Sequence, residues 1–369
     1  MSTRTNMQFP RYHSSTLTIG GYMQKIRDGH WKLATMQRSD STWPQTHYRE
    51  LIESIFNNIL TSPFIGSQIS PLNVSILDGG HRTEAIRRFY DDEIKITCPQ
   101  SRKELLYSEL TEETRAIFND KPCITIVYEG LDSLQEETLF FRVNNSLPLH
   151  PGEAVNGFIT VPLCVMAKNL GEHYADDMRS GFKQSISIRN ERGESSNVML
   201  MILYNFHRGH IEVGERPTKV NKIKDLCERL RSEVINEEKI KNNVSAMFRI
   251  IQKRKKHTPY EFHLIATIQA IMMKYDIGSR TESWSSGVSA DERIDKFASL
   301  ISDFFYEVEN PDLAPIQNAA YQSLMRTPHD QTIRGVTNPG TPSNCVKRAL
   351  IFSEWLEHKK VDLSGLLIR

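Results

Sequence analysis

The segment Val74 to Tyr90, VSILDGGHRTEAIRRFY, constrains the fold of this chain more than any other. Asn73 to Leu77 form a short apolar run typical of a strand, and Thr83 to Tyr90 continue with the spacing of a helix. Two glycines stand between them, where the backbone can adopt conformations that other residues rarely reach. The segment therefore predicts a strand, a tight turn and a helix in immediate succession.

The junction Asp78-Gly79-Gly80-His81-Arg82 is typical of a phosphate-binding loop. Glycines let the backbone approach an anion closely, and the free N–H groups of the first helical turn point at it, together with the positive end of the helix dipole. Arg82 adds a permanent cation suited to phosphate oxygens, and His81 adds a donor whose charge depends on pH. The alternative is an ordinary junction in which Asp78 caps the helix and Arg82 is solvated.

The periodicity of the chain changes near residue 158. Before this point, a short apolar run at Pro122 to Tyr128 accompanies helical patterns at His47 to Ile59 and Ser133 to Val143; beyond it, the periodic stretches have helical spacing. The helical stretches of the second half are Asn197 to Phe206, Asn221 to Ile235, Tyr260 to Tyr275, Asp291 to Phe305 and Asn344 to His358. We therefore expect an α+β fold, with one domain over residues 1–158 and a mainly α-helical domain over residues 159–369.

Asp78, Gly79 and Arg82 make the loop resemble the D-G-Q-x-R signature at the amino end of GmrSD-type restriction systems, a relative of the ParB/sulfiredoxin fold. Gly80 stands where that signature has glutamine. The spelling Gly-Gly-x-Arg is also similar to the sulfiredoxin loop, but Gly80 takes the place of that family's cysteine, so sulfiredoxin chemistry is not supported. The resemblance implies a ParB/sulfiredoxin-like amino-terminal domain that holds a nucleotide's phosphates at this loop.

Two further blocks extend the resemblance to about residues 37–157. Upstream, Gln37 and Arg38, followed by Trp43 and an apolar helix, resemble the family's first block, although an aromatic residue usual between arginine and tryptophan is missing. Downstream, the run FRVNN contains Arg142 and Asn144 and resembles the family's F-R-[IVL]-N block. The resemblance implies that these residues surround the nucleotide together with the glycine loop.

Glu153 completes the downstream block, at the start of a helix that Pro151 introduces. Its carboxylate could cap that helix, pair with an arginine, hold a magnesium ion or orient a water molecule. Asp78 and Glu153 are therefore the candidate catalytic residues, and the alternative for Glu153 is the purely structural cap or salt bridge.

The resemblance implies a nucleotide-binding protein that hydrolyses a nucleoside triphosphate, with Mg²⁺, to drive DNA recognition or restriction. Arg82 and Arg142 would stabilise phosphoryl charge. One alternative keeps the fold without turnover, as a nucleotide-sensing or DNA-binding module. A second alternative is a nuclease that uses the ParB-like domain itself. The sequence leaves open the preferred base and the formation of a homo-oligomer.

Composition limits the partners and the compartment. With 46 basic and 45 acidic side chains the formal net charge is +1, so any contact with DNA would be local. No apolar run approaches the roughly 18 residues of a membrane span, and the first residues lack the apolar core of a signal peptide. We expect an intracellular protein without membrane contact, cytoplasmic or, in a eukaryotic or viral setting, nuclear. The five scattered cysteines predict reduced, mostly buried thiols.

Two clusters in the second half have both a chemical and a structural interpretation. His207 and His210, in HRGH, could bind a metal, but they stand where an apolar helix ends. Lys253 to His257 could contact nucleic-acid phosphates or act as a nuclear import signal, or they could form a positively charged helix end. Neither cluster predicts a resident metal ion.

Overall fold

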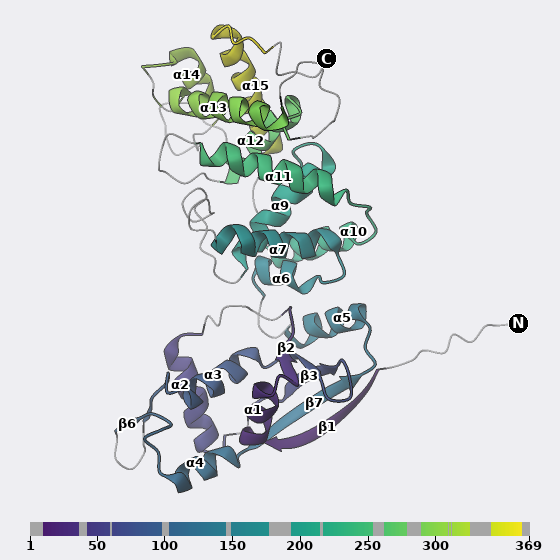
Figure 1. The fold of residues 1–369 in the computed structure, drawn as a ribbon, viewed down its shortest axis with the longest axis vertical. Coiled ribbons are helices and arrows are strands. Elements are labelled where there is room, and N and C mark those ends of the chain that lie inside the picture. Colours follow the sequence, from purple (N-terminus) through teal and green to yellow (C-terminus); the bar gives the residue numbers. More distant parts are fainter. Residues whose placement is uncertain are drawn as a thin grey trace, which may run out of the picture. The chain divides into compact units, whose positions relative to one another are not determined.

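The computed structural model describes residues 10–36, 43–59, 61–97, 103–144, 149–176, 193–214, 217–253, 262–278, 289–308, 310, 312–324 and 341–363. By its internal contacts the chain divides into two units, Met1–Thr160 and Val161–Arg369 (Figure 1). The first contains all the strands described, and the second is built from helices.

A mixed five-stranded sheet is the framework of the first unit (Figure 1). In spatial order its strands are β1 (Arg11–Thr18), β7 (Pro122–Glu129), β3 (Phe64–Gln68), β4 (Val74–Asp78) and β2 (Trp31–Leu33). β3 runs antiparallel to β4 and parallel to β7, and the register places Asp78 opposite Ile65. The carboxyl end of β4, where the glycine loop begins, therefore lies beside the segment that enters β3. β5 (Ile96–Thr97) and β6 (Glu104–Leu105) form a separate small sheet.

One face of the sheet is covered by α1 (Ile19–Arg27), α2 (Gln45–Phe56), α3 (Gly80–Tyr90) and α4 (Glu112–Asn119). Their buried residues form one core with Cys123 and Val127 of β7. Aromatic rings fill much of it, as between Phe89 and Phe118, whose ring centroids lie 5.2 Å apart. Burying each such side chain contributes about 1.5–3 kcal/mol.

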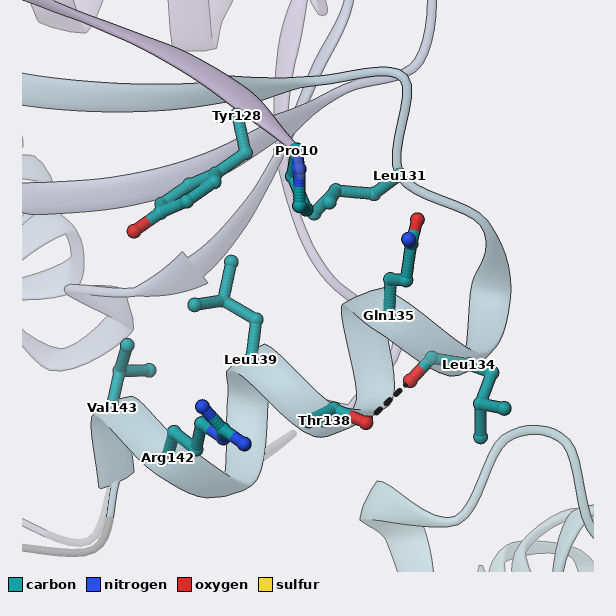
Figure 2. Close-up of a pocket in the computed structure, with 9 residues that line it drawn as sticks. All are labelled: Pro10, Tyr128, Leu131, Leu134, Gln135, Thr138, Leu139, Arg142 and Val143. Carbon is teal, nitrogen blue, oxygen red and sulfur yellow. Dashed lines mark hydrogen bonds between the residues drawn. The ribbon is translucent and has the colours of Figure 1, made fainter. Parts of the chain in front are cut away.

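The opposite face of the sheet carries α5 (Ser133–Val143), which packs against β4. Because strand side chains alternate between faces, Tyr128 of β7 points away from the core that holds Val127. Leu139 of α5 points toward Tyr128 (Figure 2). A capping box at Asp132 and Gln135 fixes the start of α5, and the short helix α6 (Pro151–Gly157) follows it in the chain.

Helices alone make up the described part of the second unit. They are α7 (Pro162–Asp176), α9 (Glu194–Arg208), α10 (Val220–Leu230), α11 (Glu237–Gln252), α12 (Phe262–Lys274), α13 (Ala290–Val308), α14 (Pro315–Ser323) and α15 (Pro342–His358). α9 is central, because every residue from Ser195 to Phe206 is buried. α7 packs against α9, α11 against α13, and α12 against α15.

A polar network crosses the core of the second unit at Asn205 of α9. Its amide nitrogen donates to the carbonyl of Val213 at 2.8 Å and to the side-chain oxygen of Gln269 at 3.1 Å. Its oxygen accepts from the backbone N–H groups of Glu212 and Val213, at 3.1 and 3.0 Å. Asn205 therefore provides hydrogen-bond partners for the backbone of the segment that follows α9, and it links this segment to α12 through Gln269.

These observations confirm the α+β fold class and the helical second half. The four described cysteines, Cys123, Cys164, Cys227 and Cys345, are buried thiols outside any disulfide among the described residues, as predicted, while Cys98 lies outside the described residues. Within the described ranges, none of the helices has both the length and the apolar character needed to cross a membrane.

Candidate phosphate-binding site

Gly79 sets the turn between β4 and α3. Its φ of 111° lies in the left-handed region, and it is the N-cap of α3. A Cβ added to Gly79 would lie 2.5 Å from Cδ1 of Phe64, at the start of β3. The backbone conformation and the packing therefore both require glycine at this position. The helix begins at Gly80, so the amide groups of Gly80 and His81 belong to its first turn.

Arg82 binds acceptors of the protein itself. Its guanidinium donates to the carbonyl of Ser62, to that of Pro63 at 3.1 Å and to Oδ2 of Asp78 at 2.9 Å. The same group lies 4.7 Å from the centroid of the Phe64 ring, and the side chain is only 12% exposed. Arg82 therefore fastens the end of β4 to the segment that enters β3. Binding of a phosphate by this side chain would compete with those contacts.

The predicted alternative junction, with Asp78 as the helix cap and Arg82 solvated, is wrong. Gly79 is the N-cap, and α3 has no side-chain cap. Asp78, the last residue of β4, forms an ion pair with Arg82 in the first turn of α3, and 33% of the Asp78 side chain remains exposed. The Asp78 carboxylate therefore helps Arg82 to fix the conformation of the glycine loop.

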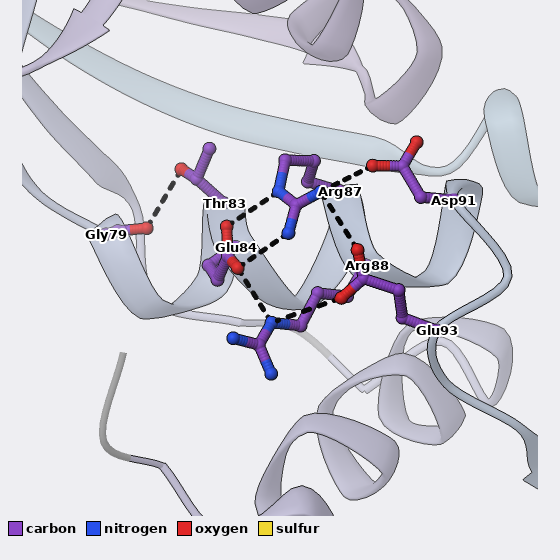
Figure 3. Close-up of polar contacts among 7 residues, drawn as sticks. All are labelled: Gly79, Thr83, Glu84, Arg87, Arg88, Asp91 and Glu93. Carbon is purple, nitrogen blue, oxygen red and sulfur yellow. Dashed lines mark hydrogen bonds and ion pairs between the residues drawn. The ribbon is translucent and has the colours of Figure 1, made fainter. Parts of the chain in front are cut away.

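Thr83 and Tyr22 fix the peptide group of Gly79. The Thr83 hydroxyl donates to the Gly79 carbonyl at 3.0 Å (Figure 3), and the Tyr22 hydroxyl lies 2.6 Å from Thr83 Oγ1. Burial raises the pKa of Tyr22 well above its ordinary value, so this phenol stays neutral. The Gly79 carbonyl points toward α3, where it accepts from Thr83, and the buried Tyr22 hydroxyl fixes the position of the Thr83 side chain.

His81 and Trp43 form a ring pair at the start of α3. Their centroids are 5.0 Å apart and their planes differ by 9°. Trp43 immediately precedes Pro44, which is the N-cap of α2. Like α3, α2 has no side-chain cap and no acidic residue in its first turn. The amino ends of α2 and α3 therefore lie beside the same ring pair. Both helix dipoles present their positive ends there.

The other charges of α3 are matched within the helix and just beyond it (Figure 3). Glu84 accepts from Arg87 Nε at 2.8 Å and from Arg88 Nε at 2.7 Å, and Arg87 also pairs with Asp91 and Glu93. The hydrogen bond from Arg87, followed by that from Arg88, lowers the pKa of Glu84 to about 2. These arginines therefore belong to an ion-pair cluster on α3.

Arg142 and Asn144 occupy the carboxyl end of α5. The Asn144 amide nitrogen donates to the carbonyl of Phe140 at 2.9 Å and closes the helix. Arg142 is exposed and lines a pocket beside Tyr128 (Figure 2). Across the described ranges, neither side chain forms a hydrogen bond or ion pair with the glycine loop.

Glu153 is buried at the start of α6. Its Oε2 accepts from the backbone N–H of His150 at 2.7 Å, as one half of a capping box. The capping interpretation offered by the sequence is therefore realised. Gln37 and Arg38, the other two predicted nucleotide-binding residues, lie outside the described residues.

In the second unit, His207 Nε2 lies 2.5 Å from Oε2 of Glu233, where α9 ends at the left-handed Gly209. Lys253 pairs with Asp295 of α13 at 3.3 Å, and the rest of the basic run, residues 254–257, lies outside the described residues. Both contacts fit the helix-end interpretations of these clusters.

Sequence reasoning missed three residues that shape the loop: Tyr22, Phe64 and Thr83. Thr83 stands four residues after Gly79, the spacing at which a helical hydroxyl reaches a backbone carbonyl, and this signal was available. Phe64 directly follows Pro63, but its contact with Gly79 depends on the pairing of β3 with β4, which the sequence does not reveal.

No family model matches this sequence, and no curated protein is similar to it at a significant level. Among solved structures, a Pnob8-like ParB-N domain aligns over 95% of this chain and 99% of its own, with 9% identity and a TM-score of 0.25. At that TM-score the likeness carries no argument about fold or function. The resemblance to the GmrSD-type family therefore gains no support from the comparisons.

Proposed function

We propose that the first unit binds the phosphate groups of a nucleoside triphosphate at the amino end of α3. The observation that carries the proposal is the open first turn of this helix, which has neither a side-chain cap nor an acidic residue. In three other helices of the unit the N-cap side chain accepts from the first turn: Thr18 in α1, Thr111 in α4 and Asp132 in α5. An uncapped amino end offers backbone donors and a positive dipole to an anion.

Two neighbouring features support a ligand with several negative charges. The uncapped amino end of α2 lies beside the same Trp43–His81 ring pair, so two helix dipoles act together. His81 brings a side chain that becomes a cation when protonated. Arg82 contributes by holding the loop in shape, since its donors already meet Ser62, Pro63 and Asp78.

We favour binding without turnover, the nucleotide-sensing alternative, over hydrolysis. Both carboxylates that the sequence offered for catalysis are engaged: Asp78 pairs with Arg82, and Glu153 caps α6. A Mg²⁺ ion at Asp78 would have to compete with the guanidinium for the same carboxylate, whose Oδ2 already accepts from Arg82. Coupling to DNA recognition, which the resemblance implies, remains a prediction.

Thermal unfolding of the full chain with ATP, GTP, CTP, UTP and inorganic tripolyphosphate, each with and without Mg²⁺, tests the proposal. A ligand at 100 times its Kd stabilises the protein to which it binds by about 2.7 kcal/mol. We expect at least one triphosphate to raise the Tm and no phosphate to be released. Release of phosphate would favour the triphosphatase, and an unchanged Tm with all five compounds would refute the site.

A matched pair of variants at His81 locates the ligand. His81→Glu places a carboxylate in the first turn of α3, which favours the helix but repels a phosphate, whereas His81→Gln keeps similar size without charge. Both variants lose the stack on Trp43. We expect the Glu variant to bind at least about 10-fold more weakly than the Gln variant. Equal affinities would place the phosphate elsewhere.

A further inference from the structure

A second binding site lies on the face of the sheet opposite the main core. A pocket of about 630 Å³ opens between α5 and the sheet, lined by Tyr128, Leu131, Gln135, Leu139, Arg142 and Val143, among others (Figure 2). Volumes of about 300–1,000 Å³ are usual for small-molecule sites, and such sites combine apolar walls with a few polar groups. The proposed phosphate site does not use this pocket.

Three polar groups of the pocket can donate hydrogen bonds to a ligand. Arg142 brings a guanidinium, and Tyr128 brings a hydroxyl. Gln135 already uses its side-chain oxygen to accept from the backbone N–H of Asp132 at 2.9 Å, so its amide N–H groups are what it can offer. The fourth polar group, the Thr138 hydroxyl, donates its proton to the carbonyl of Leu134 at 2.8 Å and can only accept from a ligand (Figure 2). No acidic residue is among the described residues that line the pocket. Such a lining favours a ligand that accepts hydrogen bonds.

Arg142 is the charge that selects this ligand. In the described part of the chain, its guanidinium forms neither an ion pair nor a hydrogen bond, in contrast to Arg82, Arg87 and Arg88. One cation beside apolar walls matches a ligand with one negative charge. A triphosphate carries several charges and would leave most of them without a partner here.

We propose that this pocket binds an amphipathic carboxylate, with the carboxylate at Arg142 and the apolar body against Leu131, Leu139 and Tyr128. Arginine meets a carboxylate with two parallel N–H donors, which fixes the orientation of the ligand. The leucine side chains and the ring remove its apolar body from water. The chemistry is that of a medium-chain fatty acid or of a peptide that ends in an apolar residue.

Calorimetric titration of the full chain with octanoate and with octan-1-ol tests the proposal. We expect octanoate to bind and octanol to bind at least about 10-fold more weakly, because hydrogen bonds to charged groups contribute most. Arg142→Gln should weaken octanoate about 10-fold, and Arg142→Lys should restore part of the loss. Lys32→Gln, an exposed cation on β2 at the opposite edge of the sheet, should leave the affinity unchanged.

Three results would overturn the proposal: equal binding of octanol, an unchanged affinity in Arg142→Gln, or displacement of octanoate by ATP in a competition titration. The last would assign Arg142 to the nucleotide site. A short peptide ending in leucine, compared with its carboxamide, extends the test to the second source of the ligand. Loss of binding in the carboxamide supports the same carboxylate recognition.

Discussion

Replacement of Gly79 by alanine tests how tightly the loop is built. A residue other than glycine at its φ of 111° costs about 1–2 kcal/mol in backbone strain. The added Cβ would also lie 2.5 Å from Phe64 Cδ1, and such overpacking costs about 1–3 kcal/mol. We therefore expect Gly79→Ala to lower the free energy of unfolding of the first unit by about 2–5 kcal/mol.

The matched control is Gly130→Ala. Gly130 also has a positive φ, of 67°, but a Cβ there would meet nothing within 4 Å, so only the backbone term of about 1–2 kcal/mol applies. Urea unfolding combined with hydrogen exchange at the amides of β4 and α3 measures both variants in the unit concerned. If Gly79→Ala costs no more than Gly130→Ala, the contact with Phe64 does not constrain the loop and the reasoning fails.

Three further predictions concern stability. Glu84→Gln should lower the free energy of unfolding by about 1 kcal/mol at neutral pH, a figure discounted for solvent screening. Folding lowers the pKa of Glu84 from 4.5 to about 2, so the stability that the ionised carboxylate contributes is lost as the pH falls through that range. Urea unfolding of both proteins at several pH values should therefore show the difference in free energy of unfolding disappear at low pH. Tyr22→Phe removes the buried partner of Thr83 and should cost about 1–2 kcal/mol in urea unfolding, without changing the fold seen by circular dichroism. Asn205→Ala should cost about 2–4 kcal/mol, measured by hydrogen exchange in the second unit, because several buried groups lose their partner; a cost below 1 kcal/mol would contradict the network.

The elements predicted best are those whose signals are local. Ser133 to Val143 is a helix with the predicted bounds, because the capping box at Asp132 starts it and Asn144 ends it. The strand and helix around the glycine loop were found for the same reason, with β4 and α3 starting and ending within three residues of the prediction. Glycine, asparagine and capping residues mark the ends of helices and strands, so these ends can be predicted without knowledge of tertiary contacts.

Strands at the edge and in the middle of the sheet escaped prediction for different reasons. β1, RYHSSTLT, is an edge strand whose side chains are mostly exposed, so it shows no apolar alternation. β3, FIGSQ, is central but short, and Gly66 packs closely against Val74 of the neighbouring strand instead of presenting a side chain. Neither strand has a clear pattern in the sequence, because both are stabilised by hydrogen bonds to neighbouring strands.

The exact ends of helices and the partners of charged side chains could not be predicted from apolar periodicity, because they depend on backbone conformation and tertiary contacts. The helix predicted over His47 to Ile59 ends at Phe56, because Asn58 adopts a left-handed φ of 57°. The sequence predicts that Arg82 binds a nucleotide, and this stays a prediction; two of its partners in the structure are backbone carbonyls 19 and 20 residues away in sequence. Only the register of β3 against β4 brings them within reach.

The left-handed backbone at Gly79 also limits how this protein can evolve toward greater stability. Serine, threonine and aspartate cap helices from an extended conformation, which the φ of 111° at Gly79 excludes. A common route by which selection raises thermal tolerance, the gain of a capping side chain, is therefore closed at this helix as long as the turn persists. Lineages under heat selection should accumulate stabilising substitutions in other parts of the chain and keep this glycine unchanged.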